Sequence, residues 1–461
     1  MNPSTLSVPE LITLQKNYFL QGNTMPVSKR KETLKKLKSL IRENEALIAE
    51  AVWNDFRKSY FEVLSNETGL VYAEISKFLK RMDRWSRPLR SRTSLANLPG
   101  KSRVYSVPFG NVLVIGSWNY PVQLALIPVV SALAAGNTVI LKPSELTSHT
   151  SGLLARIINE TFPPELFHVI EGGKQETTEI LKNRFDKIFF TGSTAVGRII
   201  MKAAAEHLTP VTLELGGKNP AIVLPDCNLA MTAKRLVWGK FHNGGQACVV
   251  PDHIYVHESV RDRLIEEVKK NIQKIFNGDP KRSEGLPRII NDASYNRIMK
   301  LINPEKTILG GNGERDKLYI EPTVMKGVTA EDAVMQEEIF GPVMPFLDFS
   351  DLDELLVRLK NEPSPLAFYL FTKDLRLARK IQREFRSGGG MINDTVVHFV
   401  NGNTPFGGVG DSGMGSYHGR AGFECFSHRK TVLTKPTWFE LWVKYPPFTK
   451  LKLRIVRAIL R

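Results

Sequence analysis

The sequence predicts an α/β protein that contains a parallel sheet covered by helices. Short runs rich in β-branched residues alternate with helical patterns through most of the chain, as is typical of such a sheet. At 461 residues the chain is longer than one hydrophobic core usually serves, so more than one domain is expected. The apolar fraction of 42% and the charged fraction of 24% are those of a folded protein, not a disordered one.

The predicted elements begin with two amphipathic helices, at 28–54 and 61–86, whose apolar residues recur at spacings of three and four. Strands then follow at 111–115, 137–142, 187–191 and 211–215, with a helix at 195–207. In parallel sheets of this kind, ligands bind beyond the carboxyl ends of the strands. The residues that follow each strand are therefore the first candidates for a site.

Residues 113–141 contain no charged side chain and are long enough to span a membrane. The stretch is broken by Trp118-Asn119-Tyr120-Pro121 and again at Gly136. Pro121 suits the first turn of a helix and Gly136 suits its end. We therefore expect a buried strand, helix and strand here.

A second alternating region runs from about 229 to 425 and is expected to form a second α/β domain. Its clearest elements are a helix at 258–276, a strand at 366–371 and a helix at 374–386. Two further strands, at 100–107 and 429–434, belong to neither region. They are expected to pair with each other or with a neighbouring subunit.

The charge and cysteine content limit the possible partners. The formal net charge of +16 suggests attraction to an anionic membrane surface, nucleic acid, substrate or cofactor, or else only solubility. No basic cluster matches a nucleic-acid-binding module. The three cysteines show no C-x-x-C pair, so neither a disulfide framework nor a structural metal site is expected. The N-terminal residues do not resemble a secretory signal, which indicates a reducing, cytoplasmic location.

The C-terminal residues 448–461 form a basic stripe on a helical projection, with apolar residues on the rest. The stripe comprises Lys450, Arg454, Arg457 and Arg461, and Lys452 interrupts the apolar side. Such a helix is typical of contact with anionic lipid. A helix docked on the protein's own dimer is the alternative.

Two side chains stand in settings that suit covalent catalysis. Cys248 follows Gly244-Gly245-Gln246-Ala247, where two glycines allow close backbone approach around an accessible thiol. Glu214 lies between two leucines on an apolar strand, where burial should raise its pKa toward that of a general base. An inert buried cysteine and an outward-facing glutamate are the alternatives.

Three strand ends carry further candidates. The Asn119 side chain could donate to a developing oxyanion, and Lys142 and Glu145 could hold the hydroxyls of a ribose. The turn from Thr191 to Gly197 joins a strand to a helix whose free amides could bind a pyrophosphate. Ordinary turns and a charged surface loop are the alternatives at each position.

Together these stretches resemble the aldehyde dehydrogenases. The resemblance covers roughly residues 20 to 436 and rests on Trp118-Asn119-Tyr120-Pro121, Lys142-Pro143-Ser144-Glu145, Phe190-Thr191-Gly192-Ser193, Leu213-Glu214-Leu215-Gly216-Gly217-Lys218, the Cys248 turn and Glu337-Glu338-Ile339-Phe340-Gly341-Pro342. The late segments Pro405-Phe406-Gly407-Gly408 and Gly413-Met414-Gly415-Ser416-Tyr417-His418-Gly419 resemble the class 3, or fatty aldehyde, branch. Val249 departs from the small residue common in that branch, which affects the expected shape of the acyl pocket.

The resemblance implies a reaction. Cys248 would attack the aldehyde to form a thiohemiacetal, whose oxyanion is held by the Asn119 amide and the Cys248 backbone N–H. Hydride transfer to NAD(P) would leave a thioester, and Glu214 would activate the water that hydrolyses it. The aldehyde would be aromatic, or aliphatic with a medium or long chain.

The resemblance also implies which residues contact the cofactor. Those residues are Trp118, Lys142, Glu145, Gly192, Ser193, Gly197, Glu338 and Phe340. Lys142 and Glu145 would hold the adenosine ribose, and Glu338, with Phe340 beside it, the nicotinamide ribose. Because Glu145 should repel a 2′-phosphate and Lys142 should attract one, NAD is favoured and NADP stays open. Gly197 would let its helix pack close to the sheet.

The expected architecture is an aldehyde-dehydrogenase-like fold with a Rossmann-like cofactor domain. That domain takes residues 1–87 and 108–213, the catalytic α/β domain 214–425, the oligomerisation strands 88–107 and 426–437, and the basic tail 438–461. A homodimer is expected, without nucleic acid or metal, in the cytoplasm and with a peripheral membrane contact through the tail. Two rival functions remain: an acylating dehydrogenase that transfers the thioester to coenzyme A, and a non-catalytic structural or membrane-associated protein.

Overall fold

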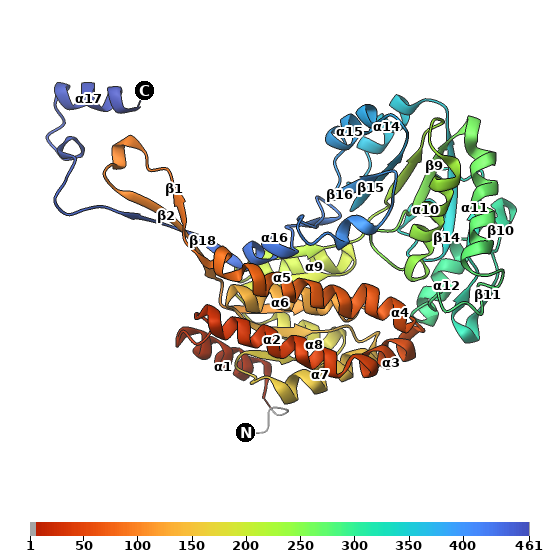
Figure 1. Cartoon of the computed structure of the whole chain (residues 1–461), viewed down its shortest axis with the longest axis horizontal. Coiled ribbons are helices and arrows are strands. Elements are labelled where there is room, and N and C mark those ends of the chain that lie inside the picture. The colour runs from red at the N-terminus through yellow and green to blue at the C-terminus, as the bar shows by residue number, and fades with distance from the viewer. Residues whose placement is uncertain (1–5, 461) are drawn as a thin grey trace.

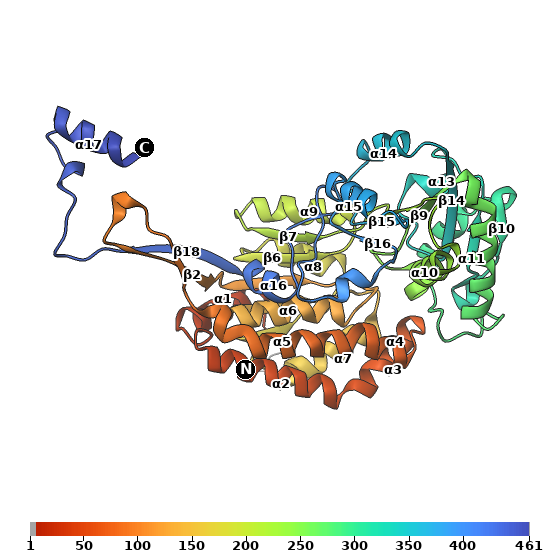
Figure 2. The same cartoon turned by 45° about the horizontal axis from the view of Figure 1, so that its top comes forward.

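The computed structural model describes residues 6–460, which form a two-part body and a protruding arm (Figures 1 and 2). The main helices are α1 (Val8–Leu20), α2 (Val27–Glu43), α3 (Glu45–Phe56), α4 (Tyr60–Val63), α5 (Gly69–Ser86), α6 (Gln123–Ala135), α7 (Ser148–Thr161), α8 (Lys174–Leu181), α9 (Thr194–Ala205), α10 (Leu229–Phe241), α11 (Arg261–Ile275), α12 (Asp292–Leu301), α13 (Ala333–Gln336), α14 (Leu352–Lys360), α15 (Leu375–Glu384), α16 (Gly419–Cys425) and α17 (Lys450–Leu460).

The first part of the body contains a six-stranded sheet in the order β17-β7-β6-β3-β4-β5. Its strands are β3 (Asn111–Ile115), β4 (Thr138–Lys142), β5 (Phe167–Val169), β6 (Lys187–Thr191), β7 (Val211–Glu214) and β17 (Gly413–Met414). All pairings are parallel except that of β17 with β7. The sheet thus matches the predicted parallel sheet at every strand that the sequence indicated.

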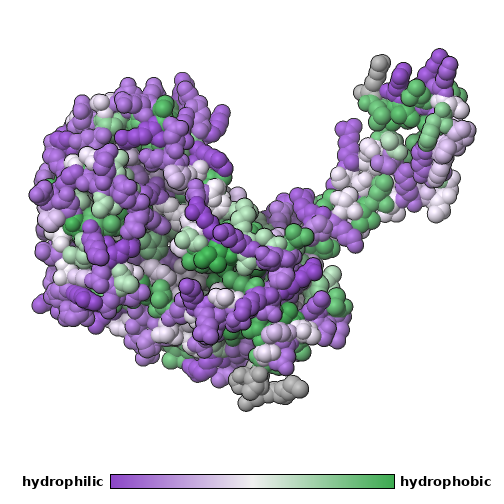
Figure 3. Space-filling model, turned by 180° about the vertical axis from the view of Figure 1, so that it is seen from behind, coloured by the Kyte–Doolittle hydropathy of each residue, from purple (hydrophilic) through white to green (hydrophobic). Residues whose placement is uncertain are grey.

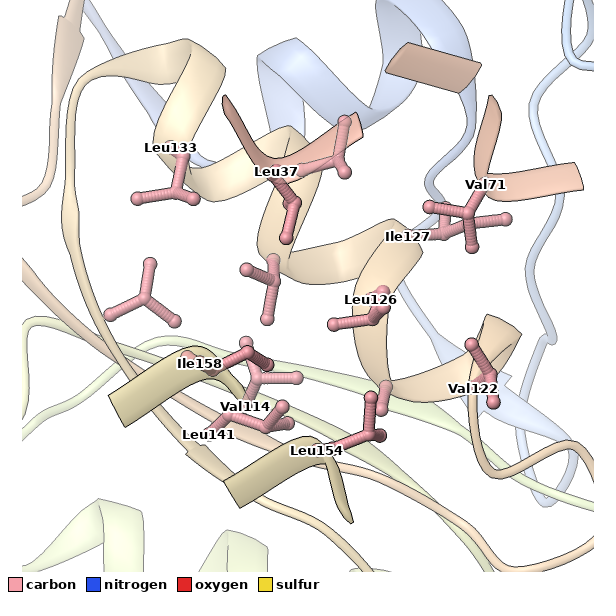
Figure 4. Packing of buried hydrophobic residues seen from close by; sticks show 14 of the residues in the cluster. Leu37, Val71, Val114, Val122, Leu126, Ile127, Leu133, Leu141, Leu154 and Ile158 are labelled. Atoms are coloured by element: carbon pink, nitrogen blue, oxygen red, sulfur yellow. The ribbon is translucent and has the colours of Figure 1, made fainter. Parts of the chain in front are cut away.

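Alternate residues of β3 and β4 enter two different cores, as the period of a strand requires. Val114 and Leu141 pack with α2, α5, α6 and α7 on one face (Figure 4), whereas Leu113 and Ile140 pack with α1, α8 and α9 on the other. Helix α6 is buried along its whole length because α2 and α5 cover its outer side. This explains its uncharged sequence: residues 113–141 are a buried strand, helix and strand, as expected.

The second part contains a seven-stranded sheet in the order β10-β13-β14-β9-β8-β15-β16. Its strands are β8 (Pro220–Val223), β9 (His253–His257), β10 (Thr307–Leu309), β13 (Thr323–Met325), β14 (Val343–Phe349), β15 (Ala367–Phe371) and β16 (Gly389–Ile392), and the short pair β11 (Gly313–Glu314) and β12 (Tyr319–Ile320) lies beside it. Helices α10 and α11 cover one face, and α12, α14 and α15 the other. A second α/β unit is therefore present.

The packing of residues 413–425 differs from the expected division. This segment was placed in the second domain, yet Gly413 pairs with Glu214 in the first sheet and α16 packs on α6. A short strand can join the edge of whichever sheet is free, and β7 offers that edge. Sequence periodicity gives no information on such a choice.

The expected helix at 28–54 is two helices, because the chain turns at Asn44 between α2 and α3. The backbone of Asn44 leaves the helical region (φ −106°, ψ 12°), and its side-chain amide donates to the carbonyl oxygen of Leu40 at 2.8 Å. The expected helix at 61–86 contains a π-helical turn, Leu64–Thr68, before α5 begins. The break at Asn44 involves neither proline nor glycine. The π-helical turn is closed by the hydrogen bond from Gly69 N to the carbonyl of Leu64, and a Cβ at Gly69 would collide with that oxygen, so glycine permits the turn. A lone glycine does not distinguish such a turn from an ordinary helical one, so the sequence did not indicate it.

The arm consists of β1 (Leu89–Ser91), β2 (Lys101–Pro108) and β18 (Ser427–Thr434). Strands β2 and β18 are antiparallel over their full length, from Ser427 opposite Pro108 to Thr434 opposite Lys101. The two predicted lone strands therefore do pair with each other. The chain then runs to α17, which lies beyond the arm (Figure 1). No helix among residues 6–460 is long and apolar enough to cross a membrane.

Candidate active site

A cavity of about 790 Å³ lies beyond the carboxyl ends of β3, β4, β6 and β7 and reaches the second sheet's loops. It brings together side chains that are far apart in the sequence. Of the residues predicted for the site, it is lined by Trp118, Asn119, Lys142, Glu145, Gly192, Ser193, Glu214, Cys248, Glu338 and Phe340. Gly197 lies one helical turn away on α9 and does not line the cavity.

Cys248 lies on a tight turn after α10. Asn243, Gly244 and Gly245 all have left-handed backbones, with φ of 53°, 64° and 76°. A Cβ at Gly245 would lie 3.1 Å from the backbone nitrogen of Pro342 and closer still to the carbonyl of Gly341. The glycine thus permits the close approach that the sequence suggested, and Cys248 itself is partly exposed.

The Asn119 side chain is almost completely buried, at 2% exposure, and points toward this turn. Its Nδ2 donates to the carbonyl oxygen of Gln246 at 3.0 Å. An amide nitrogen carries two hydrogens, so one remains available to a ligand. The backbone carbonyl of Asn119 accepts hydrogen bonds from the side chains of Lys58 and Asn243, each at 3.0 Å.

Glu214 ends β7 with its side chain 4% exposed. Neither carboxyl oxygen has a hydrogen-bond partner among the described residues. Burial therefore raises the pKa of Glu214 well above its usual value. A buried carboxyl group that lacks partners is suited to take up a proton from a nearby donor.

The thiol and two carboxyl groups influence one another. Burial raises the pKa of Cys248, and the carboxylates of Glu338 and Glu214 add to the effect. Burial, with the charge of Asp252, raises the pKa of Glu338 to about 8. Negative charge near the thiol disfavours the thiolate, so the thiol form prevails until positive charge or a proton acceptor is supplied.

The opposite end of the cavity carries the features that a nucleotide needs. The Lys142 ammonium lies 2.9 Å from Oε2 of the half-exposed Glu145. Ser193 caps α9, whose first amides face outward from the helix end. Exposed apolar side chains of Val196 and Ile199 line the same end and could cover a flat base. The charged pair, the free helix amides and the exposed apolar side chains suit the ribose, the pyrophosphate and the base of a dinucleotide.

Sequence reasoning missed the residues that hold the Cys248 turn. The Asn219 side-chain amide donates to the carbonyls of Cys248 at 2.7 Å and Val250 at 3.0 Å, and its oxygen accepts from Ala367 N at 2.8 Å. One side chain therefore ties the Cys248 turn to strand β15. The only sequence signal for Asn219 is its position directly after the Leu213–Lys218 motif.

A second missed pair holds the loop that carries Glu338. Lys218 Nζ lies 2.6 Å from Oδ2 of the buried Asp252 and donates to the carbonyl of Glu337 at 2.7 Å. Asp252 Oδ1 accepts from Ile339 N at 2.8 Å. Although burial opposes it, the charge of Lys218 keeps the pKa of Asp252 below its usual range.

An apolar cluster adjoins Cys248 on the side away from the nucleotide end. It contains Tyr120, Leu124, Ala247, Val249, Val250, Leu366, Val396 and Phe399, with Leu70 and Phe406 at its margin. Among residues 6–460, no group of three or more His, Cys, Asp or Glu side chains could hold a metal ion. Cys248 thus lies between a packed apolar cluster and a nucleotide-sized groove.

Comparisons with known proteins agree with this geometry. The family model described as "Aldehyde dehydrogenase family" matches residues 7–432. The 4,4'-diaponeurosporen-aldehyde dehydrogenase of Staphylococcus aureus (strain NCTC 8325 / PS 47) is 42% identical over 448 residues, covering 97% of each chain. The dimeric NADP-preferring aldehyde dehydrogenase of Canis lupus familiaris is 41% identical, over 95% of this chain and 98% of the relative.

Solved structures give the same result. The substrate-bound state of Staphylococcus aureus AldH superposes with a TM-score of 0.97 at 41% identity, covering 99% of this chain and 100% of that one. The Mycobacterium tuberculosis aldehyde dehydrogenase complexed with NAD+ superposes with a TM-score of 0.84 at 27% identity, covering 94% and 91%.

Proposed function

Because the chain belongs to the aldehyde dehydrogenase family, we propose that Cys248, Asn119 and Glu214 are its catalytic residues. The protein is an oxidoreductase that converts an aldehyde to a carboxylic acid with NAD or NADP. The observation that carries the assignment of residues is their convergence on one cavity, between an apolar cluster and a nucleotide-sized groove.

In the first step, the Cys248 sulfur attacks the carbonyl carbon and a C–S bond forms. The electrons of the C=O π bond move to the oxygen, and the thiol proton passes to solvent, directly or through Glu214, which is left as the carboxylate. The free N–H of the Asn119 amide and the backbone N–H of Cys248 donate to this oxyanion. The hydrogen bond from Asn119 Nδ2 to Gln246 supports the proposal, because it leaves one N–H for the oxyanion.

The second step needs a hydride acceptor, which NAD or NADP would supply when bound. Loss of hydride converts the thiohemiacetal on Cys248 to a thioester. Glu214 then removes a proton from water as the water oxygen adds to the thioester carbon, and the C–S bond breaks to release the acid. The unpartnered carboxyl oxygens of Glu214 support this role, since water can bind there without displacing a protein donor.

The cofactor is expected to lie along the groove lined by Trp118, Gly192, Ser193 and Phe340. Lys142 and Glu145 would hold the adenosine ribose, and Glu338 the nicotinamide ribose. The Glu145 carboxylate disfavours a 2′-phosphate, which supports a preference for NAD. A Cβ at Gly197 would lie 2.7 Å from Cδ2 of Leu215, which supports its role in the close packing of α9.

Steady-state kinetics test this function. Aldehydes of increasing chain length are assayed with both cofactors, with Cys248→Ala as the blank. We expect NADH or NADPH formation that the variant lacks. A Cys248→Ala protein that keeps the wild-type rate would contradict the role of Cys248 as the nucleophile.

The rival activity, transfer of the acyl group to coenzyme A, is tested in the same assay. Glu214 favours hydrolysis, because a buried general base beside the thioester serves water and not a thiol. We expect no dependence of the rate on coenzyme A. A rate that requires coenzyme A would favour the rival.

We propose medium-chain or long-chain aliphatic, or aromatic, aldehydes as substrates. The apolar cluster beside Cys248 supports this, because burial of each methylene contributes about 0.8 kcal/mol. The relative named for 4,4'-diaponeurosporen-aldehyde agrees with an apolar substrate. We expect kcat/KM to rise with chain length from C2 toward C10.

We propose a homodimer that acts in the cytoplasm, with the arm (88–107 and 426–437) as its oligomerisation element. The arm exposes apolar side chains far from the body (Figure 3), among them Leu95 at 73% and Leu98 at 47% exposure. Exposed apolar groups of this kind are usually covered by a partner. A relative described as dimeric agrees with this proposal. The domain boundaries at 87, 107 and 213 stay predictions, whereas residues 413–425 pack on the first sheet.

We also propose that the tail, 438–461, contacts anionic membranes. Lys450, Arg454 and Arg457 are exposed on α17 beside the exposed Leu451, and Arg461 lies outside the described residues. Lys452, which interrupted the apolar side, is buried and donates to the carbonyl of Tyr445 at 2.6 Å. The interruption is thereby removed from the surface of the helix.

Vesicle sedimentation tests the tail. We expect the full chain, but not residues 1–437, to sediment with vesicles that contain an anionic lipid, and neither with neutral vesicles. Equal binding by both chains would contradict the proposal.

A further inference from the structure

A buried ion pair lies directly behind Asn119. The side chains of Lys58 and Glu67 are 1% and 0% exposed, and Nζ lies 2.7 Å from Oε1. Removing two charges from water is costly, so such a pair persists only where further hydrogen bonds compensate it. The partners that provide those bonds show what the pair holds in place.

Both members bond to the chain segment that contains Asn119. Lys58 Nζ donates to the carbonyl of Asn119 at 3.0 Å and lies 4.0 Å from the ring centre of Tyr120. Glu67 Oε2 accepts from Val122 N at 3.1 Å and Gln123 N at 2.9 Å. The pair therefore holds both ends of the turn that leads from Asn119 into α6.

The backbone around Glu67 is itself unusual. Glu67 lies on the π-helical turn Leu64–Thr68, between α4 and α5. Such wide turns have poorer hydrogen-bond geometry than an α-helix and occur often at functional sites. The turn, which Gly69 permits, presents the Glu67 carboxyl group to two backbone amides at the start of α6.

We propose that Lys58 and Glu67 are positioning residues for the oxyanion-stabilising amide of Asn119. They act on the backbone: the carbonyl of Asn119 is fixed by Lys58, and the following residues by Glu67. Because Nδ2 of Asn119 also donates to the carbonyl oxygen of Gln246, the remaining N–H of this amide has a fixed direction. Displacement by about 1 Å can cost about 10²-fold in rate. The inference rests on the proposed function of Asn119.

The first experiment removes both charges together, with Lys58→Met and Glu67→Gln in one protein. Paired removal leaves neither member of the pair as an isolated buried charge, and the nearby Glu62 carboxyl group, whose pKa the charge of Lys58 lowers, can take up a proton, so folding should persist. We expect kcat to fall by about tenfold or more, while KM for the cofactor stays unchanged. The matched control is Glu74→Gln on α5, since Glu74 is equally buried but bonds to Gly419 N at 2.5 Å. We expect this control to keep the wild-type kcat.

The second experiment separates positioning from general damage. Asn119→Ala should lower kcat by about 10²–10³. In that background the Lys58/Glu67 double variant should cause no further loss, because the positioned group is absent. A full additional loss would show that the pair acts independently of Asn119 and would overturn the proposal.

The remaining outcomes are also decisive. If Asn119→Ala lowers kcat and the double variant does not, the inference fails and the proposed function stands. If Asn119→Ala keeps the wild-type rate, the role of Asn119 and the inference fail together. Should the double variant show no cooperative melting transition, Glu67→Gln alone is used in the same cycle.

Discussion

At the scale of single residues, the proposed general base Glu214 lowers the stability of the folded state at neutral pH. Its carboxyl group is buried without a partner among the described residues, which raises its pKa. The folded state therefore holds a proton that the unfolded state, with a pKa of about 4.3, releases. The stability of the protein consequently falls as pH rises above that unfolded value.

We predict that Glu214→Gln stabilises the protein in a pH-dependent way. The melting temperature of the variant should exceed that of the wild type at pH 8, and the difference should shrink toward zero below pH 4. Each unit of pKa shift corresponds to about 1.4 kcal/mol. Calorimetry or fluorescence-detected thermal unfolding at several pH values measures this difference in melting temperature. A constant difference at all pH values would exclude titration of Glu214 as the cause.

The same substitution should stop turnover after hydride transfer. We expect a burst of NADH equal to the active sites, followed by a slow steady rate, because thioester hydrolysis lacks its base. Mass spectrometry of the quenched protein should show an acyl group on the peptide that contains Cys248. Steady turnover without a burst would place Glu214 elsewhere in the mechanism.

Glu145 carries the prediction about cofactor choice. Glu145→Gln removes the negative charge that faces a 2′-phosphate while Lys142 remains. We expect kcat/KM for NADP to rise by about tenfold relative to NAD. The control is Glu179→Gln on α8, which removes another exposed, lysine-paired carboxylate. An unchanged ratio of the two cofactors would contradict the assignment.

The residues of the site were predictable to different degrees. Cys248 follows a Gly-Gly pair and Glu214 lies between two leucines, and these settings can be read from neighbouring residues. Asn219 was not predictable in this way, because it bonds to a turn and to strand β15 that are remote in the sequence. Burial of the Lys58–Glu67 pair likewise depends on α6, which lies far along the chain.

At the scale of elements, the buried strands were the best predicted. A strand buried on both faces must be apolar at every position, as β3 and β4 are, so the sequence marks it clearly. The break at Asn44 coincides with one side-chain hydrogen bond, and the π-helical turn with Gly69 and with the contact of Glu67 to the start of α6. Such features do not alter the apolar periodicity, so they could not be predicted.

Helix α9 gives a prediction at this scale. Gly197→Val would push α9 away from Leu215, because a Cβ at position 197 would lie 2.7 Å from Cδ2 of Leu215. The amides at the start of α9 would move with the helix, so we expect KM for NAD to rise by about tenfold with a smaller change in kcat. Gly285→Val is the control, since the nearest atom to its Cβ is 3.5 Å away. Equal effects of both variants would contradict this explanation.

At the scale of the whole molecule, the arm gives the prediction on assembly. Leu433 on β18 is 39% exposed, on an element that makes few contacts with the body. We expect Leu433→Glu to weaken a dimer and halve the mass measured by light scattering at micromolar concentration. Val357→Glu on the body, where the side chain is 62% exposed, should leave the mass unchanged. A monomeric wild type would contradict the proposal.

The cavity draws its walls from positions as distant as Ile115 and Phe340 and from the loops of two sheets. No contiguous fragment of the chain that stops short of either sheet can therefore turn over substrate. During renaturation from denaturant, enzymatic activity should return only after both cores have formed, later than the recovery of helical circular dichroism. Catalysis itself thus provides a clock for the last step of folding.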